Sequence, residues 1–456
     1  MNELSDLVDR PLLETIFQRR THRVSRGVAT IKAGSMTYRS TQVAEPLTPL
    51  EEAILINVVM GTGLTMPDRP FQDPATGAFV MAKPNLTMHG RSAGSPDNAQ
   101  GTHFFMIDDS GTYYLRNLPA PDGGVEFEPD ALIQRAEQAK VTLLDHRIDV
   151  PGSRDFPAYF DSNRLLSNVA GTTIFFPVVD LSHQYINGLM YLLTQPDGAR
   201  PAFVDDHNQY RLAGVEKWVA SGFLNDKIRV PLGPLGGFRT QIEPDLLLQT
   251  VFLVAEAMGL GSWIHGCLNP SILLGDPRFT PVYGPMLGFD FVTPPYSDLD
   301  NLRWNVPSAQ YAVERTHPVG LKHGDEYLIR AMCPPYFASM AAAVDEVVRL
   351  KFGAGGVYDD AATFGKIYKG DFEERYLREA PQYSDDVVAC ARDICEYIHQ
   401  THGRFPAHVD ALFAPGVWIQ VSHPDTDYYD RYFRNGLTGV QRAHFDHWHA
   451  PAVSRR

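Results

Sequence analysis

The feature that most constrains the fold of this chain is a long apolar segment that ends in a glycine turn, Leu246–Pro270. Its apolar residues recur at the three- and four-residue steps of a helix: Leu247, Leu248, Val251, Val254, Ala255 and Met258. Because other positions are apolar too, the pattern predicts a central helix over 245–258, ended by Gly259. The glycines of the following turn would let the backbone approach a flat, bulky group, although a core helix with a glycine stop is the simpler interpretation of this segment alone.

The composition indicates a packed globular protein. The chain has 456 residues, enough for two or three domains, with 44% hydrophobic and 21% charged residues. Its net charge of −14 argues against a nucleic-acid-binding protein, which needs a basic face, but leaves room for a local basic pocket.

Cysteine usage and the N-terminus suggest a cytoplasmic location. The four cysteines are scattered, which fits a reducing compartment better than a disulfide framework: Cys267, Cys333, Cys390 and Cys395. The first residues are acidic and lack the apolar core of a signal peptide. No apolar run approaches the roughly 18 residues that a membrane span needs, so no membrane association is expected.

A basic cluster follows a short predicted helix over residues 10–20. It reads Arg19-Arg20-Thr21-His22-Arg23. Guanidinium groups and a hydroxyl donor are what a phosphate group requires. The alternative is a solvated basic helix end, where cations also favour the helix dipole.

Two further segments precede the central helix. Thr48, Pro49 and Glu51 form the start of a predicted buried helix with a capping box. An irregular insertion is expected over about 65–90, followed by a polar loop and a strand–turn–strand pattern within Gly90–Leu118. The loop offers Ser, Asn and Gln side chains that could meet a planar heterocycle, or it is an ordinary approach to a hairpin.

The remaining sequence alternates between helical and strand patterns. Residues 129–148 are predicted as a helix, 167–193 as a strand followed by an apolar helix, and 281–295 as a strand. After Pro335 the patterns become mostly helical, with one short strand expected around Trp418.

Three segments, in order, resemble the FMN-dependent nitroreductase-like flavoprotein family. They are the Arg19–Arg23 cluster, the loop Ser95-Pro-Asp-Asn98-Ala-Gln100 with its strand, and the turn Ala257–Gly266 after the long helix. The resemblance implies an α+β fold: a mixed, mainly antiparallel sheet flanked by helices in a nitroreductase-like α/β sandwich. It covers residues 1–335, with insertions at about 65–90 and 167–244, and leaves 336–456 as a mostly helical C-terminal extension. It also implies a homodimer with FMN at the interface.

The resemblance assigns roles to individual residues. The phosphate would be held by Arg19, Thr21 and Arg23, with Arg20 on the phosphate or the ribityl chain. The ribityl chain or ring edge would meet Ser95, Asn98 and Gln100. The isoalloxazine would be lined by Trp263, Ile264, His265 and Gly266. A late basic residue is also expected at the phosphate, with Arg303 preferred over Arg315 and Lys322.

Two departures from the family pattern affect the chemistry. His265 stands where many members have an acidic residue, and Gly101-Thr102 replaces the expected Pro-Trp. His265 is the candidate catalytic residue, as a donor near flavin N5 or to a substrate. The alternative is a structural histidine bonded to backbone.

The implied function is an FMN-dependent oxidoreductase in which NADH or NADPH reduces the flavin and a flat, electron-poor small molecule then accepts the electrons by ping-pong kinetics. No GxGxxG follows a strand, so no separate dinucleotide-binding domain is expected. Two alternatives stay open: a flavin-binding or flavin-storing protein without turnover, and an oxygen-using flavin dehydrogenase in biosynthesis.

No metal site is expected. One helical set, Cys390, Cys395, His399 and His402, has wider spacings than zinc pairs prefer. His444, His447 and His449 lie near the end of the chain, and the segment His423-Pro-Asp425-x-Asp427 is interpreted as a solvated turn rather than a ligand loop.

Overall fold

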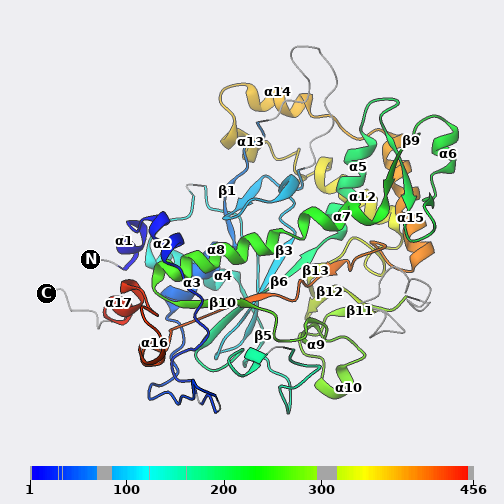
Figure 1. Cartoon of the computed structure of the whole chain (residues 1–456). Helices are drawn as coiled ribbons and strands as arrows, with labels where there is room; N and C mark the ends of the chain where they lie inside the picture. The colour runs from blue at the N-terminus through cyan, green and yellow to red at the C-terminus, as the bar shows by residue number, and fades with distance from the viewer. Residues whose placement is uncertain are drawn as a thin grey trace.

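The computed structural model describes residues 3–28, 30–32, 34–68, 85–122, 124–160, 162–294 and 316–449. Within them, a seven-stranded antiparallel sheet forms the centre of the molecule (Figure 1). Its order is β10 (Gly261–His265), β15 (Trp418–Ser422), β6 (Thr172–Asp180), β3 (Thr102–Ile107), β4 (Thr112–Leu115) and β5 (Lys140–Leu144), with β14 (Leu412–Phe413) also on β6. The predicted α+β class with a mainly antiparallel sheet is confirmed.

Both faces of the sheet are covered, as the alternation along β3 illustrates. Phe104 and Met106 join an apolar cluster with α3 (Pro49–Val59), α4 (Pro129–Ala139) and α8 (Glu243–Met258). Phe105 and Ile107 join a second cluster with α5 (Ser182–Leu193), α12 (Met340–Phe352) and α15 (Asp385–His402). Because successive strand residues face opposite sides, a strand between two layers of helices has apolar residues on both faces.

The central helix forms where the sequence predicted it, as α8. Its C-cap Gly259 has a φ of 89°, the left-handed conformation that glycine adopts at little cost. The expectation of burial on nearly all sides is wrong, since Leu246 is 43% exposed and Leu253 lines an open apolar cavity. The helix therefore presents an apolar outer face.

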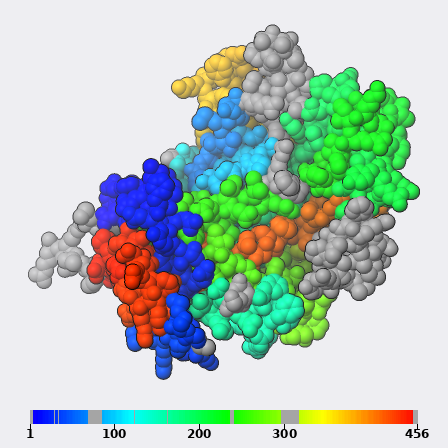
Figure 2. Space-filling view, viewed as in Figure 1, coloured from blue at the N-terminus to red at the C-terminus, as the bar shows by residue number. Residues whose placement is uncertain are grey.

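The segment after residue 335 contributes to the central sheet. Strand β15 pairs with β10 on one side and β6 on the other, so a division at residue 335 would cut the sheet. The helices of this segment are α12, α13 (Ala361–Ile367), α14 (Phe372–Glu379), α15, α16 (Thr426–Tyr432) and α17 (Gly439–Trp448). Figure 2 shows the last two, in red, beside the N-terminal segment in blue.

The remaining elements surround this centre. At the N-terminus lie α1 (Glu3–Val8), α2 (Leu12–Gln18) and the pair β1 (Gly61–Leu64) and β2 (His89–Arg91). The segment after α5 forms β7 (Pro201–Asp205), β8 (Arg211–Leu212), α6 (Glu216–Ala220), β9 (Asn225–Pro231) and α7 (Leu232–Thr240). Further along are α9 (Pro270–Leu274), α10 (Thr280–Tyr283), β11 (Asp290–Val292), β12 (His317–His323) and β13 (Glu326–Arg330).

Three element predictions need correction. The helix predicted over 129–148 ends at Ala139 and gives way to β5. The strand predicted over 281–295 is short, since β11 covers only 290–292 and α10 precedes it. The span 167–244, expected as an insertion, contains the central strand β6. Most of the other expected insertion, 69–84, lies outside the described residues.

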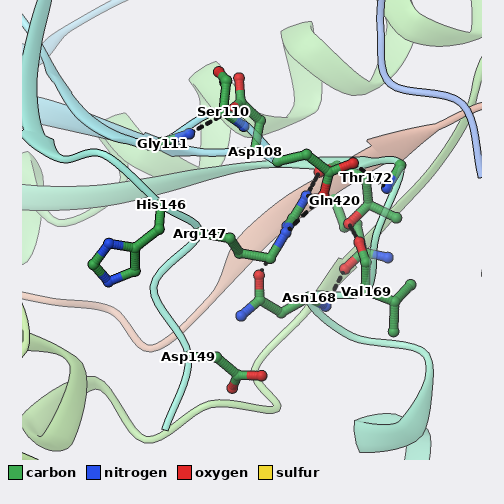
Figure 3. A network of polar contacts seen from close by, with 12 residues as sticks. Asp108, Ser110, Gly111, His146, Arg147, Asp149, Asn168, Val169, Thr172 and Gln420 are labelled. Carbon is green, nitrogen blue, oxygen red and sulfur yellow. Dashed lines mark hydrogen bonds and ion pairs between the residues drawn. The ribbon is translucent and has the colours of Figure 1, made fainter.

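A polar network fixes one end of the sheet (Figure 3). The Arg147 guanidinium donates to Asn168 Oδ1 at 3.0 Å and to the Thr172 carbonyl at 2.5 Å. The Asn168 backbone N–H donates to Gln420 Oε1 of β15 at 2.8 Å. These hydrogen bonds satisfy backbone polar groups that would otherwise be buried without a partner at the strand ends.

Among the described residues, no helix has both the length and the apolar character needed to cross a bilayer.

Candidate functional site

Three arginines line one cavity of about 430 Å³ at the N-terminal segment. They are Arg20, Arg23 and Arg434, and the Thr21 backbone and side chain also border the cavity. Tyr428, Tyr429 and Phe433 supply aromatic walls, and no acidic side chain is among the described lining residues. Arg20 Nη1 donates to the Gln18 and Arg19 carbonyls, each at 3.0 Å. A cavity lined by three arginines and by no described acidic residue favours an anionic ligand, and a phosphate group suits these residues.

The cavity is assembled from segments that are distant in sequence. The His22 backbone N–H donates to the Ser262 carbonyl of β10 at 3.1 Å. The buried His22 ring donates through Nε2 to the Gly436 carbonyl at 2.8 Å, and its Nδ1 lies 3.2 Å from Gln441 Nε2 of α17. His22 thus acts as a structural residue that joins the basic cluster to β10 and to the segment that carries Arg434.

The structure brings together only part of the predicted phosphate set. Arg19 points away from the cavity, because its guanidinium lies over the Phe252 ring of α8, 5.0 Å from the centroid. Arg303 and its rival Arg315 lie outside the described residues. Lys322 is on β12, where its ammonium group lies 5.5 Å from the Tyr327 ring. Arg434 was not predicted, because it lies in an aromatic-rich segment, Tyr428–Gly436, that matches no motif of the resemblance.

The glycine turn adjoins this cavity. Arg23 lies 5.9 Å from the centroid of the Trp263 ring, so the basic cluster and β10 are neighbours as the resemblance implied. Strand β10 pairs with β15 on one side, and among the described residues no strand pairs with its other edge. The His22 backbone N–H occupies the Ser262 carbonyl of that edge, whereas Ile264, which is 41% exposed, points out of the core.

His265 is in a structural position. It is buried, its ring stacks on Trp263 at 3.8 Å, and Trp418 Nε1 lies 3.0 Å from its Nε2. An indole N–H can only donate, so Nε2 accepts and carries no proton. The structure therefore favours the structural alternative over a catalytic donor, with a tryptophan as the main partner. Gly266 is required sterically, since a Cβ there would lie 2.5 Å from the Gly416 carbonyl.

The polar loop Ser95–Gln100 lines a second cavity of about 520 Å³. Asn98 donates to the carbonyls of Thr87 and His89, and its Oδ1 accepts from Gln100 Nε2 at 2.8 Å. The Ser95 hydroxyl donates to Glu243 at the start of α8. These bonds fix the loop, so its side chains are preorganised rather than free.

Arg91 is a residue of this second cavity that the sequence did not single out. It is buried, and its Nε and Nη1 atoms have no hydrogen-bond partner among the described residues. Burial lowers its pKa to about 10, which the Glu243 carboxylate partly offsets. A buried cationic donor that faces a cavity is suited to an electron-rich or anionic ligand group.

The departure from Pro-Trp has a local explanation. A Cβ at Gly101 would lie 2.8 Å from the Asp180 carbonyl, so only glycine fits beside β6. Thr102 donates its hydroxyl to Glu243 Oε2 at 3.1 Å. Gly101 therefore allows the close approach to β6, and Thr102 links the loop to Glu243 of α8.

The two cavities lie at opposite ends of α8. The loop cavity is at Glu243, whereas the arginine cavity is beside β10, which follows the end of the helix. A helix of 16 residues is about 24 Å long, so the two sets of residues lie in separate cavities along its length.

The cysteines and histidines of α15 do not form a metal site. Cys390 and Cys395 are buried in the apolar core, where burial raises the pKa of each thiol. His402 Nε2 instead lies 2.8 Å from Asp205 Oδ2. The turn at Asp425, expected to be solvated, is buried: its carboxylate caps α16 and accepts from the Tyr38 hydroxyl at 2.8 Å.

Comparison with known proteins adds little. No protein-family model and no curated protein matches the chain. Among solved structures, it is similar to a candidate nitroreductase of Ralstonia eutropha JMP134, with 12% identity and a TM-score of 0.26. The similarity covers 58% of this chain and 74% of that chain. At this TM-score the likeness establishes neither fold nor function.

Proposed function

We propose that the protein is an FMN-dependent oxidoreductase of nitroreductase type. The observation that carries this proposal is the arginine cavity, in which Arg20, Thr21 and Arg23 meet Arg434 beside β10. The first three belong to a cluster that resembles the phosphate-binding segment of that family, and β10 contains its glycine turn.

The residues of the chain would act mainly as binding and orienting groups. Arg20, Arg23 and Arg434 would neutralise the phosphate, and Thr21 would donate a hydrogen bond to it. The outer edge of β10 would lie along the ring. When bound, FMN would supply the redox chemistry, with NADH or NADPH as reductant and a flat, electron-poor small molecule as substrate.

A second copy of the chain would complete the site. The separation of the two cavities along α8 supports this, since Arg23 and Gln100 line different cavities. The surface supports it, because α2 exposes Leu12, Leu13 and Phe17. Beside them, an apolar cavity of about 470 Å³ is lined by Leu253 and Val254 of α8. Contiguous apolar surface of this kind is typical of a protein interface.

The test is FMN affinity in a matched pair of arginine variants. Arg434→Ala removes a cavity arginine, whereas Arg431→Ala removes an exposed arginine on α16 that does not line the cavity. We expect the first to raise the FMN Kd about 10- to 100-fold, as for loss of one charge-assisted hydrogen bond, and the second to leave it unchanged. Flavin fluorescence titration measures the FMN Kd of both variants. Equal Kd values would contradict the assignment of the arginine cavity to the FMN phosphate.

Turnover is a separate measurement. Anaerobic addition of NADH or NADPH to the FMN-loaded protein should bleach the flavin absorption. The burial of Trp263 and His265 favours one competing function, a protein that holds flavin without turnover. Bound flavin that neither reductant bleaches would select that function. Reoxidation by oxygen without activity on electron-poor aromatics would instead select an oxygen-using dehydrogenase.

A further inference from the structure

Four side chains from distant parts of the sequence converge at the junction of α3, β15 and α17. They are Glu51, His423, His444 and His449, and one ligand atom of each lies within 4.8 Å of all the others. The first three are buried and His449 is half-buried. This cluster is separate from both cavities described above.

The distances within the cluster are those of ligands around a common centre. Glu51 Oε1 lies 2.8 Å from His444 Nε2, 3.4 Å from His423 Nε2 and 3.5 Å from His449 Nε2. The Nε2 atoms of His423 and His449 are 3.3 Å apart. Tetrahedral zinc with bonds of about 2.0–2.1 Å places its ligand atoms about 3.3 Å from each other.

The ring tautomers leave lone pairs directed inward. His423 Nδ1 lies 2.9 Å from the Glu45 carbonyl, and His444 Nδ1 lies 2.9 Å from the Met258 carbonyl. A carbonyl only accepts, so both Nδ1 atoms carry a proton, and in a ring with this single proton Nε2 presents a lone pair. His449 Nδ1 faces the Glu45 carboxylate at 3.8 Å. Such outer partners are typical of zinc-bound histidines.

The contact between His444 and Glu51 is short but poorly aligned for a hydrogen bond. The two atoms are 2.8 Å apart, yet His444 Nε2 is buried without a partner of hydrogen-bond geometry among the described residues. A lone pair on this nitrogen and a carboxylate oxygen would repel each other unless a proton or a cation lies between them. A divalent cation bound by both would satisfy them.

The glutamate is held in a ligating orientation by its own helix. Its Oε2 accepts the Thr48 backbone N–H at 2.6 Å in the capping box, which leaves Oε1 directed at the histidines. The Phe445 ring packs against His423 and His449, with centroids 5.0 and 4.6 Å away. Glu51 therefore completes the capping box of α3 through Oε2 and presents Oε1 to the three histidines.

We propose that Glu51, His423, His444 and His449 bind a zinc ion. Three imidazoles and one carboxylate suit zinc, and four protein ligands form a closed, structural site rather than one with an open catalytic position. The ion would join α17 to α3 and to the end of β15. Because Gly436 and Gln441 contact His22, this junction would also help to position Arg434.

The experiment is metal analysis of the untagged full-length protein together with variants of α17. We expect stoichiometric zinc in the wild type and visible d–d absorption of four-coordinate cobalt when Co²⁺ replaces it. His444→Ala and His449→Ala should each weaken Zn²⁺ affinity at least about tenfold, given that loss of an outer partner alone costs that much. His447→Ala on the same helix is the matched control, since His447 is 52% exposed and lies near Asp6.

Thermal unfolding keeps the test independent of flavin binding. Zn²⁺ added to chelator-treated protein should raise the Tm of the wild type and of the His447 variant, but not of the His449 variant. A folded wild-type chain that contains no zinc and shows no Tm shift with Zn²⁺ would overturn the proposal. Unchanged zinc affinity in the His444 and His449 variants would overturn it as well.

Discussion

Lys351 is a fully buried lysine of α12, a position that a charged amine rarely occupies. Its Nζ donates to Asn187 Oδ1 at 3.0 Å and to the Tyr383 hydroxyl at 2.7 Å. Burial lowers its pKa to about 7, and the negative charge of Asp97 offsets this only in part. Burial lowers the pKa of His183 to about 4, and the positive charge of Lys351 lowers it further.

The lowered pKa of Lys351 predicts that the stability of the folded chain depends on pH. Between about pH 7 and pH 10.5 the unfolded chain binds a proton at Lys351 that the folded chain has released, so the free energy of unfolding should rise with pH across this range. Below pH 7 both states are protonated and the full cost of the buried charge applies. Lys351→Met keeps most of the volume but should lose this dependence.

Urea unfolding at pH 7 and pH 9 measures the effect. We expect the midpoint of the wild type to rise more than that of Lys351→Met, and the exposed control Lys366→Met to behave as the wild type. Parallel pH profiles for the wild type and Lys351→Met would show that the Lys351 amine stays protonated in the folded chain, as it does in the unfolded chain.

At the scale of elements, the end of α8 determines how the central helix, β10 and α17 meet. Gly259 has a positive φ, and a Cβ there would lie 2.9 Å from the Val440 carbonyl of α17. Alanine would therefore be strained and would also press on α17. We expect Gly259→Ala to reduce the free energy of unfolding by about 1–3 kcal/mol.

A matched control exists on α17 itself. Gly439 has no positive φ, and a Cβ there would meet nothing within 4 Å, so Gly439→Ala should be nearly neutral. Chemical denaturation of the two variants compares them directly. A Gly259→Ala chain as stable as the control would mean that the turn relaxes without cost.

At the scale of the whole molecule, the exposed apolar face of α2 predicts self-association. Leu13 is 64% exposed and Phe17 is 76% exposed, next to the apolar cavity of α8. Burying such surface is favourable by about 25 cal/mol per Å². We expect a wild-type dimer in sedimentation velocity and a monomer for Leu13→Glu combined with Phe17→Glu.

Sedimentation velocity also serves for the control variant and for the outcome that would contradict the dimer. Val282→Glu changes an exposed apolar residue of α10, far from this face in sequence, and should leave the dimer intact. A wild-type monomer at all concentrations would contradict the second copy in the proposed flavin site, while leaving the arginine cavity open to test by FMN affinity.

The sequence by itself determined the local elements. The apolar spacing and glycine stop located α8 within two residues, and Thr48 with Glu51 located the start of α3. The turn after Ile107 located the hairpin of β3 and β4. These features depend on residues a few positions apart, which interact wherever the segment lies in the fold.

The tertiary structure decided the long-range arrangement. The sequence predicted a strand near Trp418 but not its place between β10 and β6, because strand partners depend on the whole topology. The cavity is lined by the predicted Arg20, Thr21 and Arg23, but its third arginine, Arg434, comes from a segment about 410 residues later.

The metal cluster shows the same division most clearly. The capping box at Glu51 was readable from three residues, whereas His423 and Glu51 are separated by 372 positions. His265 was a plausible catalytic group until its burial against Trp418 assigned the ring nitrogen a partner. A side chain's chemistry is set by what packs around it, and only the folded chain specifies that environment.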